Sequence, residues 1–138
     1  MAAYNKVPGS REAIAEQINV GSDQWAICLS NTAPTSTAFT AGTTDLATGG
    51  GYTAGGKNVA TISAAETGGI YRLVLADPTL WTATGSDMGP LRYALLVDKT
   101  VNLVVGYWDR GSSVTLSAAT ADTFAVDLDG TNGGFTLS

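Results

Sequence analysis

The sequence predicts an all-β fold: a two-sheet β-sandwich of jelly-roll or immunoglobulin-like topology with a short N-terminal α-helix. Short apolar segments alternate with Gly-, Asp- and Asn-containing turns, mostly at the spacing of about 8–12 residues that is typical of sandwiches. Gly, Ala, Thr and Ser supply 66 of the 138 residues, and only 14% are charged. Apolar residues are spread along the whole chain, so residues 1–138 are expected to form a single folded domain.

The one helix is expected near the N-terminus. Ser10 is a plausible N-cap, Ile14 and Ile18 lie four residues apart on one helical face, and Gly21 would end the helix. Residues 1–9 are interpreted as an N-terminal arm whose first seven residues could be deleted without unfolding the domain.

Strands are expected over most of the remaining chain. Residues 24–30 alternate, which places Trp25, Ile27 and Leu29 on one face. Residues 110–111 are expected to turn the chain between two later strands. The other expected strands are residues 58–64, 70–76, 79–84, 91–97, 101–108, 113–117, 123–129 and 135–137.

Residues 31–57 form a long loop rich in Gly and Thr, in which Phe39, Leu46 and Tyr52 are isolated apolar anchors. No clear period runs through this segment. Loops of this length are usually functional, so it is interpreted as a second candidate contact segment.

Composition argues against several classes of function. The net charge is −5, and no two of the seven Lys and Arg residues are adjacent, so no basic cluster for nucleic acid or an anionic membrane is expected. No stretch of 18 apolar residues is present, and the first residues lack the apolar core of a secretory signal.

Catalytic chemistry is not expected either. The chain has no histidine, which rules out a Ser-His-Asp triad, and one cysteine, Cys28, which is interpreted as a small core residue. The acidic candidates show no spacing that singles out an acid–base pair; they are Asp109, Asp122, Asp127 and Asp129.

A near match to a phosphate-binding loop runs from Gly51 to Gly56, Lys57 and Asn58. Asn58 stands where the motif needs Ser or Thr, and a strand pattern follows instead of a helix. The segment is therefore interpreted as a flexible loop that enters a strand, and no cofactor is expected.

A second partial motif is the start of a calcium loop at Asp127, Asp129, Gly130 and Asn132. Its twelfth position is Ser138, where a full loop needs a bidentate Glu. A β-turn is the favoured interpretation, and no metal is expected.

The densest group of aromatic and charged residues is residues 107–111, which include Tyr107, Trp108 and Arg110. Two interpretations stay open. The group either anchors a protein interface, or it forms a strand end with one ring in the core and an ion pair at a turn.

Several segments together resemble a group of small virion proteins of tailed bacteriophages, and the resemblance covers nearly the whole chain. The segments are Met-Ala-Ala-Tyr-Asn-Lys-Val at residues 1–7, Leu-Ser-Asn-Thr-Ala-Pro at 29–34, Gly-Tyr-Thr-Ala-Gly-Gly at 51–56, Tyr-Arg-Leu-Val-Leu-Ala-Asp at 71–77, Gly-Pro-Leu-Arg-Tyr-Ala at 89–94 and Gly-Tyr-Trp-Asp at 106–109. None of these motifs is diagnostic of a chemistry.

The resemblance implies a capsid decoration (cement) protein, made in the bacterial host cytoplasm and located on the capsid surface of the virion. Such a protein would be non-enzymatic, would bind the major capsid protein and would form a homo-oligomer, typically a trimer. The residues expected at that interface are Tyr4, Lys6, Val7, Phe39, Tyr52, Trp108 and Arg110.

Two other functions remain open. The first is a structural protein of the tail, such as a tube, terminator or fibre-associated subunit. The second is a carbohydrate-binding β-sandwich module in which Trp81, Trp108 or Tyr107 stacks on sugar rings. Burial of those rings would argue against the second function.

Overall fold

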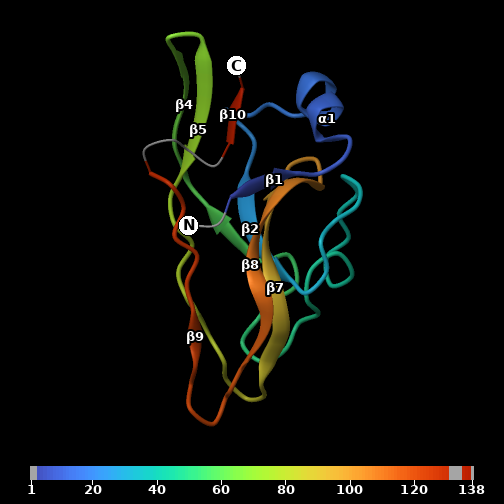
Figure 1. Cartoon of the computed structure of the whole chain (residues 1–138), viewed down its shortest axis with the longest axis vertical. Coiled ribbons are helices and arrows are strands. Elements are labelled where there is room, and N and C mark those ends of the chain that lie inside the picture. Colours follow the sequence, from blue (N-terminus) through green and yellow to red (C-terminus); the bar gives the residue numbers. More distant parts are fainter. Residues whose placement is uncertain (1–2, 131–134, 138) are drawn as a thin grey trace.

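A computed structural model describes residues 3–130 and 135–137. It contains one short helix and ten β-strands, and every strand pairing is antiparallel (Figure 1). The elements are β1 (Tyr4–Lys6), α1 (Ser10–Glu16), β2 (Trp25–Ser30), β3 (Lys57–Val59), β4 (Thr61–Thr67), β5 (Ile70–Leu75), β6 (Trp81–Thr82), β7 (Met88–Asp98), β8 (Leu103–Leu116), β9 (Thr123–Phe124) and β10 (Phe135–Leu137). None of the described helices is long and apolar enough to cross a membrane.

The strands form three sheets. The largest has the order β1-β8-β7-β2-β3, the second has the order β10-β5-β4, and β6 and β9 form a two-stranded ribbon. The β4–β5 hairpin projects at one end of the elongated molecule (Figure 1). The predicted mostly-β fold with one short helix is thus confirmed, and its several antiparallel sheets are consistent with a sandwich-like arrangement.

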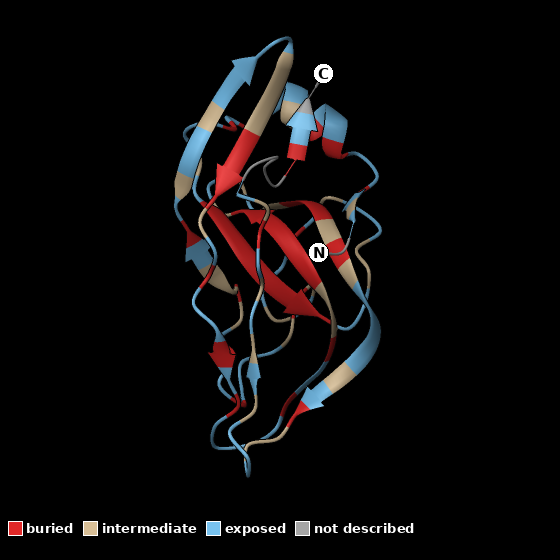
Figure 2. Cartoon of the chain, turned by 60° about the vertical axis from the view of Figure 1, so that its left-hand side comes forward, coloured by how far each residue is buried: buried red, intermediate tan, exposed pale blue. Residues whose placement is uncertain are grey.

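The core lies on both faces of β2. Trp25, Ile27 and Leu29 are fully buried in the main core, as the alternation predicts. Cys28 points to the opposite face, where it packs in a smaller core with residues from the N-terminal segment and the long loop, including Val7 and Phe39. All six residues of β2 are therefore buried, and Figure 2 shows this buried centre in red.

The long loop is packed against β2 through one buried carboxylate. Asp45 accepts hydrogen bonds from the Tyr52 hydroxyl and from the N–H groups of Gly42 and Gly55. The N–H of Leu29 in turn donates to the Tyr52 hydroxyl at 3.1 Å. Burial is the main reason that the pKa of Tyr52 lies far above its ordinary value, so this hydroxyl keeps its proton.

The helix differs in detail from the expected one. Gly9, in a left-handed conformation with φ of 87°, caps the helix, and Ser10 is its first residue. The helix ends at Glu16, because the chain leaves helical geometry at Gln17. Ile18 is nevertheless 9% exposed and packs in the core from outside the helix. The predicted cap and the predicted end at Gly21 are therefore wrong.

The segment predicted as an arm is partly a strand. Tyr4, Asn5 and Lys6 pair with β8, and Val7 is 2% exposed. Deleting these residues would remove an edge strand and part of the smaller core, so the domain is not expected to tolerate the deletion without a loss of stability.

Two expected strand boundaries are also wrong. The strand predicted at 58–64 is divided at Ala60 into β3, which pairs with β2, and β4, which pairs with β5. Residues 110–111 do not turn the chain, because β8 continues to Leu116. Gly111 (φ 100°) lies in a bulge instead, where the pairing shifts from Tyr93↔Asp109 to Leu91↔Val114.

The segment 123–129 keeps its predicted faces, but only its first two residues form the predicted strand. Phe124, Val126 and Leu128 pack against the main core, whereas only Thr123 and Phe124 form ladder pairs. The β-turn expected around residues 127–132 is only partly described, because residues 131–134 lie outside the described residues.

Candidate interaction surfaces

The seven residues predicted at an interface fall into two groups, four with buried side chains and three with side chains that are partly or fully exposed. Four are buried inside this chain, at 9% exposure or less: Val7, Phe39, Tyr52 and Trp108. Lys6 and Arg110 are exposed, and Tyr4 is intermediate. In this conformation only Tyr4, Lys6 and Arg110 can present a side chain to a partner.

The aromatic group at 107–111 lies inside β8 and not at a strand end, so that part of the second interpretation is wrong, whereas its buried ring and its ion pair are both present. Trp108 packs edge-on against Tyr4, with 5.4 Å between ring centroids. Arg92 on β7 binds Asp109 on β8 through two hydrogen bonds of 2.8 and 3.0 Å. The guanidinium, followed by the N–H of Gly111, holds the pKa of Asp109 below its usual range.

Cys28 is a core residue, as predicted. Its side chain is fully buried, and burial is the main reason that its pKa rises to about 12, with a smaller effect from Asp45. A thiol with this pKa stays protonated near neutral pH and is a poor nucleophile.

Lys57, at the end of the phosphate-loop-like segment, serves a structural role. Its Nζ donates to the carbonyl oxygens of Thr79 and Leu80 at 3.1 and 2.8 Å, and it lies 5.0 Å from the centre of the Trp81 ring. A strand follows it, so the helix that a phosphate-binding loop needs is missing.

The acidic candidates do not gather into a metal site. No group of three or more His, Cys, Asp or Glu suited to a metal ion occurs within 3–130 and 135–137, and Asn132 falls outside those ranges. Asp122 is an example of a structural role, because it accepts hydrogen bonds from the N–H of Ser117 and the hydroxyl of Thr120. These bonds lower its pKa.

The longest edge strand of the described sheets is β4. This seven-residue strand pairs with β5 on one side and with no described strand on the other. Its residues are small or uncharged except Glu66, and Ile62 is 64% exposed. It contains none of the Lys or Pro residues that usually protect a sheet edge, although a register shift between Thr61 and Ser63 bends its first part.

The other edge strands of the two larger sheets are short. β1, β3 and β10 have three residues each, and β3 begins with the positively charged Lys57. The free edge of β4 is the surface that sequence reasoning missed, because edge status depends on long-range pairing. The only available signal was the Gly68–Gly69 turn, which marks the hairpin.

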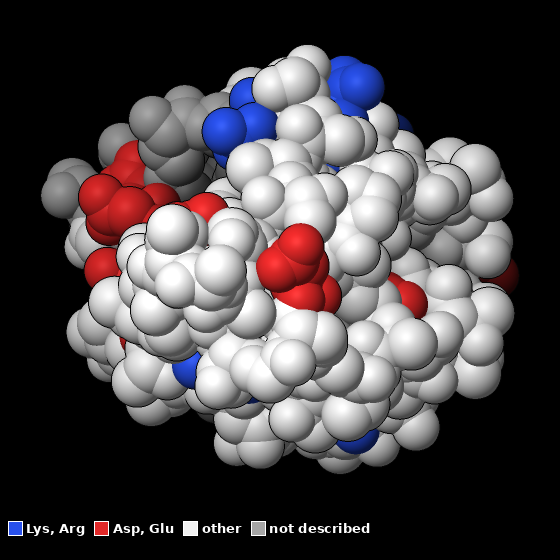
Figure 3. Space-filling model, turned by 90° about the horizontal axis from the view of Figure 1, so that it is seen from below, with Lys and Arg blue, Asp and Glu red and all other residues white. Residues whose placement is uncertain are grey.

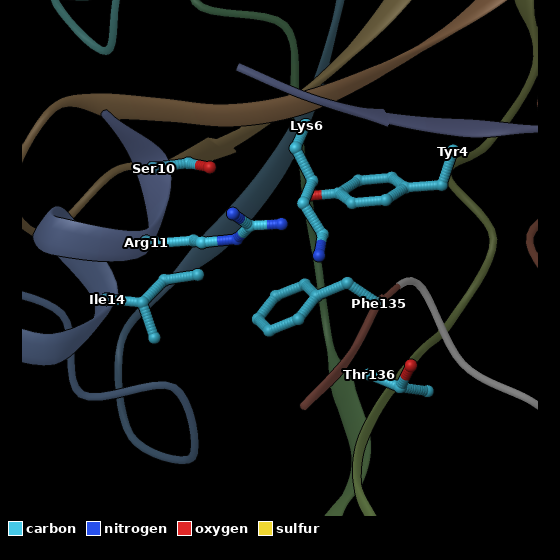
Figure 4. A pocket seen from close by; sticks show the side chains of 7 residues that line it. All are labelled: Tyr4, Lys6, Ser10, Arg11, Ile14, Phe135 and Thr136. Carbon is cyan, nitrogen blue, oxygen red and sulfur yellow. The ribbon is translucent and has the colours of Figure 1, made fainter. Parts of the chain in front are cut away.

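Two of the hollows on the surface of the described residues are the most roomy of those found. One, of about 380 Å³, lies between β7, β8 and the segment after β9, and Arg92 and Arg110 contribute to it. The other, of about 370 Å³, lies between β1, α1 and β10, and Figure 4 shows its side chains. Figure 3 views the end opposite the β4–β5 hairpin, where uncharged atoms dominate and acidic and basic groups are scattered.

Comparison with family models, with curated proteins and with solved structures gave no match.

Proposed function

We propose that this chain is a non-enzymatic structural protein of a tailed-bacteriophage virion, which decorates and stabilises the capsid by binding the major capsid protein. The observation that carries the proposal is the free edge of β4 on a projecting hairpin. An exposed edge can accept a strand from a partner, since main-chain hydrogen bonds supply affinity without a pocket.

The composition of β4 fits this use. Small side chains such as Ser63 and Ala65 let a second backbone approach, and Ile62 offers apolar area to a partner. A weak contact is sufficient on a capsid, because an oligomer that binds several shell subunits gains from multivalency. The proposal therefore includes a homotrimer, and a jelly-roll or immunoglobulin-like sandwich is the topology we propose for its subunit.

The carbohydrate-binding alternative loses support at two of its three candidate rings, because Trp81 and Trp108 are 1% and 6% exposed and present no ring face to a sugar. The third ring, Tyr107, is half-buried and packs edge-on against Tyr93. A structural protein of the tail would use the same free edge. The number of copies of this chain per virion distinguishes a tail protein from a capsid decoration protein.

The first experiment is quantitative mass spectrometry of purified particles. Decoration predicts hundreds of copies, near parity with the major capsid protein. A few to a few tens of copies would contradict capsid decoration and place the chain in the tail, and absence from the particles would overturn the virion proposal.

A pair of variants tests β4 itself. Ile62→Glu and Leu80→Glu each replace an exposed aliphatic side chain, at 64% and 51% exposure, and only Ile62 lies on β4. A charge on a strand edge disfavours strand addition. Rebinding of purified chain to particles that lack it should weaken at least about tenfold for Ile62→Glu, a change of about 1.4 kcal/mol. Leu80→Glu should bind like the unmodified chain; equal loss in both variants would contradict the role of β4.

A further inference from the structure

The hollow between β1, α1 and β10 brings together both ends of the described chain. Tyr4 and Lys6 come from β1, Ser10 and Arg11 begin α1, and Phe135 begins β10. Figure 4 shows Arg11 reaching toward Lys6 across the hollow, with the Tyr4 hydroxyl directed into the same space and the Phe135 ring beside it. The cavity volume is about 370 Å³, enough for a side chain of a bound segment.

Two positive charges converge here without a partner. The only ion pair among the described residues joins Arg92 to Asp109, and neither Lys6 nor Arg11 donates a hydrogen bond to any described residue. The chain as a whole carries a net charge of −5, so a hollow with two unpaired cations stands out from its surroundings. Two like charges at one site favour an anion between them.

Two further donors face the hollow. Ser10 is only 3% exposed and lines it, and its hydroxyl makes no hydrogen bond within the described part of the chain. The Tyr4 hydroxyl is also without a described partner, and burial raises the pKa of Tyr4 well above its ordinary value, so the hydroxyl remains a donor. The hollow thus offers two cations and two hydroxyls.

Its remaining wall is apolar. The ring of Phe135, which is 5% exposed, and the side chain of Ile14 complete the lining. A ligand with an anionic head and a short aliphatic stem matches this arrangement, because the stem can pack on the wall while the head meets the donors. Glu and Asp side chains have this form. Two isolated cations on an acidic protein do not make the extended basic track that a nucleic acid needs.

We propose that this hollow binds a side-chain carboxylate presented by an acidic segment of a partner polypeptide, with Lys6 and Arg11 pairing with the carboxylate and Ser10 and Tyr4 donating hydrogen bonds to it. The site is separate from the β4 edge and does not depend on the proposed virion function.

The test uses the purified full chain and two short peptides that differ at one position, one with a central Glu and one with Gln. Binding is followed by amide shifts in nuclear magnetic resonance spectra. The Glu peptide should shift the amides of residues 6–11 and 135–136, and the Gln peptide should bind at least about tenfold more weakly.

Three variants localise the effect. Lys6→Gln and Arg11→Gln should each weaken Glu-peptide binding at least about fivefold, because each removes one charge from the hollow. Arg110→Gln removes the same charge elsewhere, since Arg110 lies outside this hollow and binds Ser112. It should leave binding unchanged. All three positions are exposed, and a thermal unfolding scan confirms that the variants fold.

Three outcomes would overturn the proposal. The first is equal binding of the Glu and Gln peptides, and the second is an equal effect of Arg11→Gln and Arg110→Gln. The third is displacement of the peptide by inorganic phosphate at similar concentration, which would make the hollow a general anion site. Because no particle enters this test, its failure would leave the capsid proposal untouched.

Discussion

Asp98 is a fully buried carboxyl group at the end of β7. Its Oδ1 accepts hydrogen bonds from the N–H groups of Thr100 and Val101, whereas Oδ2 is buried without a hydrogen-bond partner among the described residues. The nearby Asp23 carboxylate favours the protonated form of Asp98, first as the acceptor of a side-chain hydrogen bond and then through charge repulsion, and Lys99 donates to the carbonyl of Gly55 instead. Burial first, and Asp23 second, raise the pKa of Asp98 to about 7.

This raised pKa sets the sign of a pH dependence. In the unfolded chain an Asp has a pKa of about 3.9, so between about pH 4 and pH 7 the folded protein holds a proton that the unfolded chain has released. The contribution of Asp98 to the free energy of unfolding therefore falls as the pH rises through this window, and it levels off above pH 7.

We predict that Asp98→Asn stabilises the protein at about pH 8 by about 1–3 kcal/mol. Asn keeps the acceptor that Thr100 and Val101 use, carries no charge, and places an amide donor where Oδ2 now lacks a partner. Urea unfolding at about pH 4.5 and about pH 8 measures the free energy of unfolding at each pH. This free energy should fall much less between the two pH values in the variant than in the unmodified chain. A variant no more stable than the unmodified chain at pH 8 would contradict this role.

Asp122→Asn is the matched control, because the pKa of Asp122 is shifted in the opposite direction to that of Asp98. The pKa of Asp122 is lowered by hydrogen bonds from Ser117 and Thr120, so its contribution is present above about pH 4 and lost as the pH falls further. This substitution should destabilise the protein at pH 8 and have little effect at low pH.

At the scale of elements, the close packing of β1 on β8 depends on the absence of a side chain at Gly106. Gly106 lies opposite Lys6, and the ring of Tyr4 covers the position that a Cβ at Gly106 would occupy. That ring also stacks against Phe135 at 6.2 Å and meets Trp108 edge-on. The bare backbone at Gly106 therefore lets β1 lie close to the sheet.

We predict that Gly106→Ala destabilises the protein by about 1–3 kcal/mol, because the added methyl group must displace the Tyr4 ring or β1. Urea unfolding measures the cost, and hydrogen exchange of the amides of residues 4–6 should accelerate selectively. Gly130→Ala is the control: Gly130 has an ordinary φ and open space around it, so its effect should stay within about 0.5 kcal/mol. Equal stability of the two variants would show that β1 is not held at Gly106.

Sequence periodicity predicts faces better than boundaries in this protein. The inward sides of 24–30 and 123–129 follow from alternation, since every second residue must face the core. The break at Ala60 carries no Gly or Pro signal, and a positive-φ glycine such as Gly111 serves a bulge as well as a turn.

The candidate surfaces were harder to predict. The free edge of β4 depends on which strands pair, and the donor-lined hollow joins residues near both ends of the sequence. Lys6 was predicted at an interface and lies in that hollow, whereas Ser10 was assigned as a cap and Arg11 had no predicted role. Long-range pairing of this kind leaves no local pattern in a single sequence.

At the scale of the whole molecule, the aromatic residues are mainly interior. The three tryptophans, Trp25, Trp81 and Trp108, are 0%, 1% and 6% exposed. The indole N–H of Trp25 donates to the carbonyl of Val20 at 3.0 Å, so even this polar group is used internally. Large rings supply much of the core of a chain in which small residues dominate.

This distribution predicts that tryptophan fluorescence of the native chain resists aqueous quenchers. Iodide should quench the folded protein at least about threefold less efficiently than the urea-unfolded chain, because a charged quencher does not enter a packed interior. Caesium ions should give the same ratio, which excludes the net charge of −5 as the cause of protection from iodide. If the native chain were quenched nearly as well as the unfolded one, the ring of Trp81 or Trp108 would have to be accessible to water. That result would favour sugar binding over binding through the β4 edge, because a ring that stacks on a sugar must first be accessible to water.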